Sequence, residues 1–149
     1  MGRYPLVEEI HTPLTASRCF EAFVGHPFSF FLDSGMDPGK LGRYSFMGSD
    51  PFLVIRSRGD KVSLIRDEVE EVKRGNPFDI LGELLDVYSL DGSQAGVPFT
   101  GGVVGYFSYD LCHFIERLPS TAVDDLNLPE CYLAFYDAIV AFDHLEGRA

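Results

Sequence analysis

The sequence predicts an α+β fold of mixed, mainly antiparallel sheets with helices on the outside. Short β-type segments outnumber the segments with helical spacing. The two kinds do not alternate regularly, as they would in a doubly wound parallel sheet. With 149 residues and 46% hydrophobic content, the chain is long enough for one core, so a single domain over residues 1–149 is expected.

The first helix is expected behind Thr12 and Pro13, a capping residue followed by a residue that suits the first helical turn. Apolar side chains then recur at three- and four-residue spacing as far as Gly25. A His-Pro pair ends the helix. The wholly apolar run Phe28–Leu32 predicts a strand that is covered on both faces, and therefore a central one.

Three short strands are expected after a loop rich in Asp, Gly and Pro at residues 33–40. They cover residues 43–47, 52–56 and 61–66, and their spacing indicates a meander. Between the last two, Arg58-Gly59-Asp60 has the composition of a hairpin turn, which we favour over its likeness to a cell-adhesion tripeptide.

The second helix follows Asn76 and Pro77, which repeat the capping signature. Apolar residues from Phe78 to Tyr88 recur on one face of this helix. Each large side chain that this face buries contributes about 1.5–3 kcal/mol. The polar residues 89–98 then have the composition of a linker.

Glycines and aromatic residues are interleaved in residues 101–119, which read GGVVGYFSYDLCHFIERLP. Glycines weaken a strand, so Gly101, Gly102 and Gly105 predict a backbone or ring that packs closely against them. After a Tyr-Asp pair, apolar residues fall near helical spacing as far as Pro119. This spacing predicts a short amphipathic helix.

Residues 131–142 form a long apolar run and are expected to make one strand buried on both faces. Residues 143–149 have turn composition, and no return strand follows them. A long strand followed by a turn, with no second strand to pair with it, is an incomplete hairpin, and such strand edges are usually paired or covered in a complete protein. We therefore expect the chain to be a fragment of a longer protein.

Charge and cysteine content restrict the partners and the compartment. The net charge is −11, which repels phosphate backbones and anionic lipids, so neither nucleic acid nor a membrane is an expected partner. Cys19, Cys112 and Cys131 form no CxxC pair and favour a reducing, cytoplasmic setting. No run reaches the roughly 18 apolar residues of a membrane span.

The sequence predicts no catalytic residue and no metal site. Cys112 and His113 are adjacent, and neighbours on a helix diverge by about 100 degrees, so they do not form a nucleophile–base pair. His11, His26 and His144 have no spacing that suits a metal site, and we interpret them as loop residues.

Three blocks of the sequence resemble a known family: residues 31–34 (FLDS), residues 42–51 (GRYSFMGSDP) and residues 101–119. In order and spacing they are similar to the N-terminal half of component I of aminodeoxychorismate (para-aminobenzoate) synthase or anthranilate synthase. The family's fold is a four-layer α/β/β/α arrangement of two sheets with outer helices. The resemblance implies that this chain is the N-terminal scaffold domain, and that the chorismate-binding domain with its Mg²⁺ lies outside it.

The same resemblance implies a tryptophan pocket. FLDS occupies the position at which the family has a serine that binds the amino group of tryptophan, and a second segment lines the pocket. The implied ligand-binding residues are Ser34, Leu41, Gly42, Arg43 and Tyr44. A small group of polar residues beside an apolar cavity suits a zwitterionic amino acid, because the polar residues can hydrogen-bond its charged end and the cavity can hold its side chain. From the residues alone, Asp33 and Ser34 could equally be loop caps, Arg43 could pair with a carboxylate, and Tyr44 could lie in the core.

Two features favour the folate-pathway enzyme: FLDS begins as early as residue 31, and Asp33 replaces the glutamate more common in the tryptophan pathway. The resemblance then implies a transferase that aminates chorismate to 4-amino-4-deoxychorismate, with a glutamine amidotransferase subunit as its partner. The alternatives are anthranilate synthase, a lyase with a feedback tryptophan site, and a stand-alone module that binds an aromatic amino acid. Open sheet edges further predict self-association.

Overall fold

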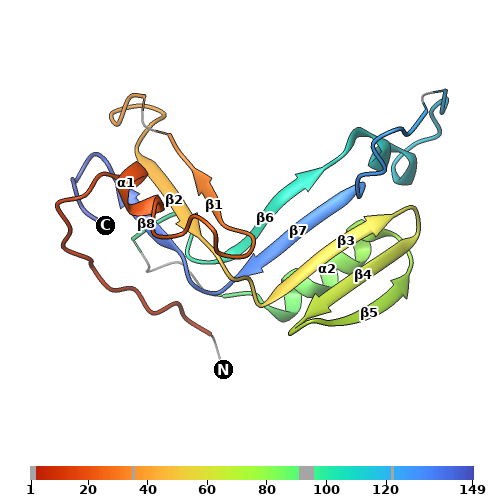
Figure 1. Cartoon of the computed structure of the whole chain (residues 1–149), viewed down its shortest axis with the longest axis horizontal. Helices are drawn as coiled ribbons and strands as arrows, with labels where there is room; N and C mark the ends of the chain where they lie inside the picture. Colours follow the sequence, from red (N-terminus) through yellow and green to blue (C-terminus); the bar gives the residue numbers. More distant parts are fainter. Residues whose placement is uncertain (1–2, 35, 91–95, 122) are drawn as a thin grey trace. The chain divides into compact units, whose positions relative to one another are not determined.

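The computed structural model describes residues 3–34, 36–90, 96–121 and 123–149 (Figure 1). It has the predicted α+β class, with two antiparallel sheets and few helices. The elements are α1 (Ala16–Phe20), β1 (Phe30–Leu32), β2 (Tyr44–Gly48), β3 (Leu53–Arg58), β4 (Lys61–Arg66), β5 (Val69–Arg74), α2 (Pro77–Val87), β6 (Gly102–Phe107), the 3₁₀ helix η1 (Tyr109–Phe114), β7 (Cys131–Tyr136) and β8 (Val140–Asp143).

The chain divides into two compact units, and each contains one sheet. The first unit comprises the described residues up to Pro51, residues 89–102 and Tyr136–Ala149, and its sheet has the order β1-β2-β8. The second unit comprises Phe52–Tyr88 and Val103–Phe135, and its sheet has the order β5-β4-β3-β7-β6. The four-layer packing and the single domain over residues 1–149 stay predictions.

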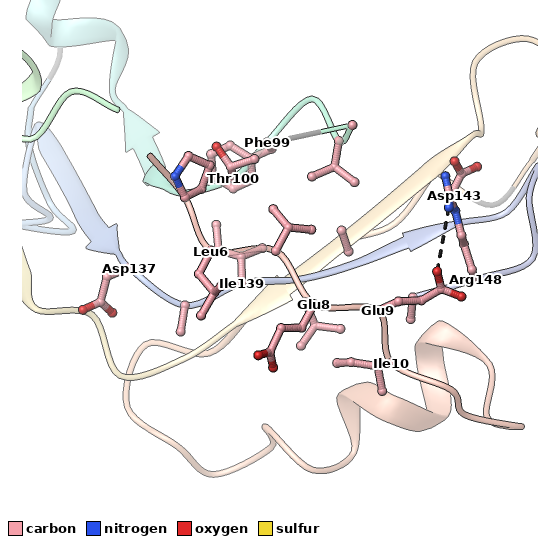
Figure 2. A pocket seen from close by; sticks show the side chains of 18 residues that line it. Leu6, Glu8, Glu9, Ile10, Phe99, Thr100, Asp137, Ile139, Asp143 and Arg148 are labelled. Atoms are coloured by element: carbon pink, nitrogen blue, oxygen red, sulfur yellow. Dashed lines mark ion pairs between the residues drawn. The ribbon is translucent and has the colours of Figure 1, made fainter. Parts of the chain in front are cut away.

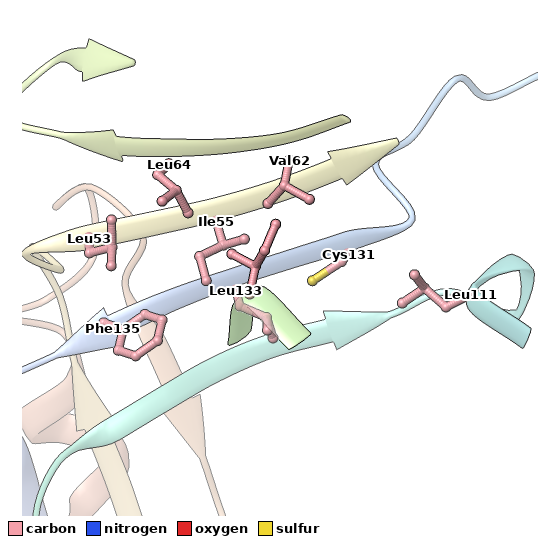
Figure 3. Close-up of a cluster of buried hydrophobic side chains, with 9 residues drawn as sticks. Leu53, Ile55, Val62, Leu64, Leu111, Cys131, Leu133 and Phe135 are labelled. Atoms are coloured by element: carbon pink, nitrogen blue, oxygen red, sulfur yellow. The ribbon is translucent and has the colours of Figure 1, made fainter. Parts of the chain in front are cut away.

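The core of the second unit forms where α2 packs on its sheet (Figure 3). Asn76 caps α2 as predicted, because its side-chain oxygen accepts a hydrogen bond from the backbone N–H of Phe78 at 2.9 Å. Ile80 from the apolar face of the helix is buried against the strands. The buried residues of this cluster are Leu53, Ile55, Val62, Leu64, Ile80, Leu111, Cys131, Leu133 and Phe135.

The glycines of residues 101–105 allow the close packing that the sequence predicted. A Cβ atom on Gly105 would lie 2.1 Å from the carbonyl oxygen of Tyr132 and 2.8 Å from the Cα of Leu133, both in β7. A Cβ on Gly101 would lie 3.3 Å from the carbonyl oxygen of Tyr136. The glycines are therefore required where the backbone passes close to β7.

β1 is an edge strand, so the prediction of a central strand at Phe28–Leu32 is wrong. Within the described residues it pairs only with β2, and Leu32 is 46% exposed. Its phenylalanines are explained by ring contacts instead. Phe31 stacks on Phe20 of α1 at a centroid distance of 5.1 Å, and Phe30 meets Tyr136 edge-on at 4.7 Å.

The predicted strand at residues 131–142 is in fact two strands in different sheets. β7 pairs with β3, whereas β8 pairs with β2, and residues 137–139, which begin with a bend, separate them. The run is apolar because each half is buried in its own sheet. An apolar run alone does not reveal such a change of sheet.

The predicted meander is shifted by one strand. β2 pairs with β1 and β8, and the antiparallel meander is formed by β3, β4 and β5. The sequence missed β5 because its charged side chains are mostly exposed and show no apolar face. The turn at Gly59 and Asp60 joins β3 to β4, as its composition predicted.

Both short helices differ from their predictions. α1 is capped by Thr15, whose hydroxyl accepts from the N–H of Arg18, because the Thr12 hydroxyl instead accepts from Leu14 within its own turn. α1 ends at Phe20, well before Gly25. η1 is a 3₁₀ helix that ends at Phe114 rather than near Pro119; its Leu111 is buried in the core, whereas Ile115, which follows it, is exposed. Of the predicted linker at residues 89–98, residues 91–95 lie outside the described structure.

Candidate functional site

The loop after β1 folds back onto Gly42 and brings it against Ser34. The carbonyl oxygen of Ser34 accepts from Met36 N–H at 2.8 Å, and that of Asp37 accepts from Gly42 N–H at 2.8 Å. A Cβ atom at position 42 would lie 2.1 Å from the Ser34 carbonyl oxygen. Only glycine fits this contact, so Ser34 and Gly42 meet through their backbones.

Arg43 is paired with a carboxylate, one of the alternatives that the sequence left open. Its Nε donates to Oδ1 of Asp143 at 3.0 Å and its Nη2 donates to Oδ2 at 2.7 Å. The backbone N–H groups of Leu145 and Glu146 also donate to Oδ1. The hydrogen bonds from Arg43, and after them those backbone donors, lower the pKa of Asp143 to about 2.

Tyr44 supports the Arg43 side chain, whereas Leu41 lies apart. The guanidinium carbon of Arg43 is 4.9 Å from the centre of the Tyr44 ring, which is a cation–π contact. The Tyr44 ring also stacks on Phe46 at 5.9 Å and is half-buried. Leu41 is 93% exposed. The five predicted residues therefore form two contacts, Ser34 with Gly42 and Arg43 with Tyr44.

A hydrogen-bonded chain that the sequence did not predict connects Asp33, Ser45 and His144. The Ser45 hydroxyl donates to Oδ1 of Asp33 at 2.7 Å, and its oxygen is 2.6 Å from Nε2 of His144. Ser45 is completely buried. His144 is therefore more than the isolated loop residue that the sequence indicated.

The register of the strands explains why Asp33, Ser45 and His144 lie close together. β1 pairs Leu32 with Phe46, so the next residue, Asp33, lies beside Ser45. β8 places Phe142 opposite Ser45, and His144 follows two residues later on the same face. One signal was present in the sequence. Ser45 shares a face with the buried Met47, and a hydroxyl on a buried face needs hydrogen-bond partners.

Two adjoining cavities lie in the first unit. The larger, of about 840 Å³, is lined by residues 9–17, Asp33, Pro38, residues 142–144 and residues 147–149. Asp33 and His144 therefore reach it from the two ends of the hydrogen-bonded chain. None of the five predicted residues lines either of these cavities, although Asp33 directly precedes Ser34.

The smaller cavity, of about 490 Å³, lies between residues 5–10, residues 96–100 and β8 (Figure 2). Its labelled apolar side chains include Leu6, Phe99 and Ile139. An ion pair between Glu9 and Arg148 at 3.9 Å and a hydrogen bond from Ile10 N–H to the Ala149 carbonyl attach the N-terminal segment.

Cys131 is buried, which raises the pKa of its thiol to about 11 and keeps it protonated. Among the described residues, no three His, Cys, Asp or Glu side chains gather as metal ligands. No helix in the described part of the chain is long and apolar enough to span a bilayer.

Comparisons with known proteins identify the family of this chain. No family model matches the chain. It is 34% identical over 147 residues to anthranilate synthase component 1 of Acetivibrio thermocellus, covering 97% of this chain and 30% of that protein. The corresponding protein of Pseudomonas putida is 34% identical over 156 residues, covering 99% of this chain and 31% of the relative. For Bacillus subtilis the identity is 30% over 117 residues, covering 78% of this chain and 23% of the relative.

The chain belongs to the component I family of anthranilate and aminodeoxychorismate synthases, as the resemblance of its motifs indicated. It matches the N-terminal part of these relatives. It spans 23–31% of the length of these three curated relatives.

Proposed function

We propose that this chain is the N-terminal scaffold and ligand-pocket domain of an anthranilate synthase component I. The observation that carries the proposal is the likeness over 97% of the chain to a protein of that name. The three relatives described above all carry that name, which favours the alternative over the aminodeoxychorismate synthase that Asp33 and the early FLDS block indicated.

The complete protein would convert chorismate and ammonia to anthranilate and pyruvate, with ammonia delivered by a glutamine amidotransferase subunit. Among the described residues, no three or more His, Cys, Asp or Glu side chains gather where they could hold a metal ion, so these residues do not fit a Mg²⁺ site. We propose that the chorismate chemistry and its Mg²⁺ belong to the part of the relatives' length that this chain does not span. Self-association and a cytoplasmic location stay predictions.

The activity is tested by supplying the complete gene product with chorismate, ammonia and Mg²⁺ and identifying the products. We expect anthranilate and pyruvate in equal amounts, because aromatisation of the aminated ring expels the enolpyruvyl group. Formation of 4-amino-4-deoxychorismate without pyruvate would instead identify the folate-pathway enzyme. No conversion at all would favour a stand-alone binding module.

The ligand pocket of the proposal is a tryptophan site at Ser34, Leu41, Gly42, Arg43 and Tyr44, beside the larger cavity. That cavity, of about 840 Å³, is large enough for an amino acid, and Asp33 provides a carboxylate at its wall. Gly42 lets the Ser34 loop pack down, and Arg43 fixes Asp143 at the same wall. Leu41 offers exposed apolar surface for an indole ring.

Calorimetry with tryptophan tests this pocket. We expect Ser34→Ala to weaken binding about tenfold, because one hydrogen bond to a charged amino group is lost. Ser120→Ala, a change at an exposed serine of the second unit, is the matched control and should leave the affinity unchanged. Absence of binding to the folded wild-type protein would exclude the pocket.

A further inference from the structure

The outer edge of β8, on the side away from β2, has open backbone groups. The backbone N–H of His144 donates to the Arg43 carbonyl at 2.7 Å, so His144 faces β2. Backbone groups of successive strand residues point to opposite edges, so Phe142 also faces β2, whereas Asp143 and Ala141 face outward. In the described part of the chain, neither the N–H nor the carbonyl of Ala141 has a backbone partner on that outer edge.

The residues after the turn begin a new strand on this edge. The N–H of Asp143 donates to the Arg148 carbonyl at 2.8 Å, and the N–H of Arg148 donates to the Asp143 carbonyl at 3.2 Å. These two bonds form an antiparallel bridge. In the same register Ala149 lies opposite Phe142, and the residue that follows Ala149 would lie opposite Ala141. That position is the next hydrogen-bonded pair, so both outward groups of Ala141 would be satisfied there.

The smaller cavity lies where this strand would extend (Figure 2). It is bordered by residues 137–141 and by the N-terminal residues 5–10. Of residues 5–10, only Ile10 has a backbone hydrogen bond within the described chain, to the Ala149 carbonyl at 2.7 Å. Both borders therefore present unpaired backbone groups. An added strand can satisfy such groups, whereas a small apolar ligand cannot.

The side chains of β8 determine which face of the added strand packs on the core. Phe142 is buried in a cluster of the first unit, and Val140 and Ala149 pack against the same cluster. Residues directly opposite one another in neighbouring strands share a face. The second residue after Ala149 would therefore lie beside Val140 and face this cluster. We expect an apolar side chain at that position.

The occupant that fits this space is the continuation of the same polypeptide. The chain matches the N-terminal part of its relatives and spans 23–31% of their length, so most of each relative lies beyond the matched part. A segment that directly follows Ala149 enters in the register already set by Arg148. A second copy of the chain carries the same net charge of −11, which opposes close approach.

We propose that the smaller cavity is a strand-accepting slot, and that the segment following Ala149 in the complete protein occupies it as an antiparallel strand on β8. The sheet β1-β2-β8 then gains this strand as its fourth. The inference rests on membership of the family and does not depend on the tryptophan pocket. It assigns the smaller cavity to the polypeptide itself rather than to a ligand.

Hydrogen exchange of the complete gene product, measured at single residues by mass spectrometry, tests whether the edge is covered. We expect the Ala141 amide to exchange about a hundredfold or more slowly than an unprotected amide, because it donates to the added strand. The Phe142 amide, which faces β2, is the internal reference for a protected position. Rapid exchange at Ala141 beside slow exchange at Phe142 would overturn the inference.

A designed disulfide tests which segment occupies the slot. Val140→Cys is combined with a cysteine at the second residue after Ala149, the directly opposite position. The background carries Cys19→Ala, because Cys19 packs against the same cluster. Opposite residues of this kind have Cα atoms about 4.5 Å apart, within the range of a disulfide, so we expect an intramolecular cross-link. A cysteine at the first residue after Ala149 points to the other face and should not cross-link.

The two measurements distinguish the possible occupants. A protected Ala141 without the cross-link would identify a different segment or another molecule, and a cross-link between two chains would identify a second copy. Either result overturns the proposal. The exchange measurement uses the wild-type protein, so it decides the matter even if a cysteine variant does not fold. Anthranilate formation is a separate assay, so failure of the proposed activity is a different outcome.

Discussion

Gly105→Ala is expected to lower the free energy of unfolding of the second unit by about 3 kcal/mol or more. The added Cβ would lie 2.1 Å from the carbonyl oxygen of Tyr132 and 2.8 Å from the Cα of Leu133. Both are backbone atoms of the neighbouring strand β7, so neither can move aside as a side chain would. The strands must separate locally, which weakens hydrogen bonds and core contacts. Denaturant unfolding followed by circular dichroism measures the change.

Gly82→Ala is the matched control for this substitution. Gly82 lies in α2, is exposed, and has no atom within 4 Å of its added Cβ. Alanine suits a helix better than glycine, so this variant should be more stable than the wild type by about 0.5–1 kcal/mol. The same glycine-to-alanine change is thus expected to lower the free energy of unfolding at position 105 and to raise it at position 82. A Gly105→Ala protein as stable as the wild type would contradict the close packing of β6 on β7.

Asp143→Asn is expected to destabilise the first unit by about 2 kcal/mol at neutral pH, toward the low end for hydrogen bonds to a charged group. The Asp143 side chain is 5% exposed and accepts from both Arg43 nitrogens and from two backbone N–H groups. Removing its charge leaves Arg43 without an ionic partner. The loss is moderated because Arg43 is 38% exposed and keeps contact with water.

The pH dependence of this effect has a definite sign. The folded-state pKa of Asp143 is lowered to about 2, below the ordinary value of about 3.9 for an unfolded aspartate. Its contribution is therefore complete above the unfolded pKa and is lost as the pH falls through about 2. The stability difference between wild type and Asp143→Asn should shrink over this interval in unfolding measurements.

An exposed ion pair provides the control. Asp60 pairs with Arg74 at 2.9 Å, with both side chains more than half exposed. Asp60→Asn should change stability little at any pH, because solvent screens such pairs. If the two asparagine variants lose equal stability, the buried position of Asp143 has no special role.

The features that sequence predicted well depend on neighbours along the chain. The Asn76 cap and the apolar face of α2 are set within a few residues, and the strand at Lys61–Arg66 begins directly after a turn of recognisable composition. The features that it missed depend on distant partners. The aromatic residues of β1 did not reveal that α1 and Tyr136, rather than two flanking strands, contact their rings.

The candidate site was harder to predict for the same reason. Ser34 and Gly42 were found through their motifs, but Ser45 lies 12 residues from Asp33 and 99 residues from His144 in the sequence. Their meeting requires the registers of β1, β2 and β8, and a slip of one residue would turn Ser45 to the opposite face. No local pattern contains that information.

The pairing of β2 with β8 has a consequence for synthesis on the ribosome. Arg43 and Asp143 are 100 residues apart, so β2 emerges long before the strand that completes its sheet. At about 5–20 residues per second, a nascent chain waits roughly 5–20 s for that partner. Throughout this interval one edge of β2 has no backbone partner from β8. The rate of translation, rather than any local preference of β2, sets the duration of that exposure.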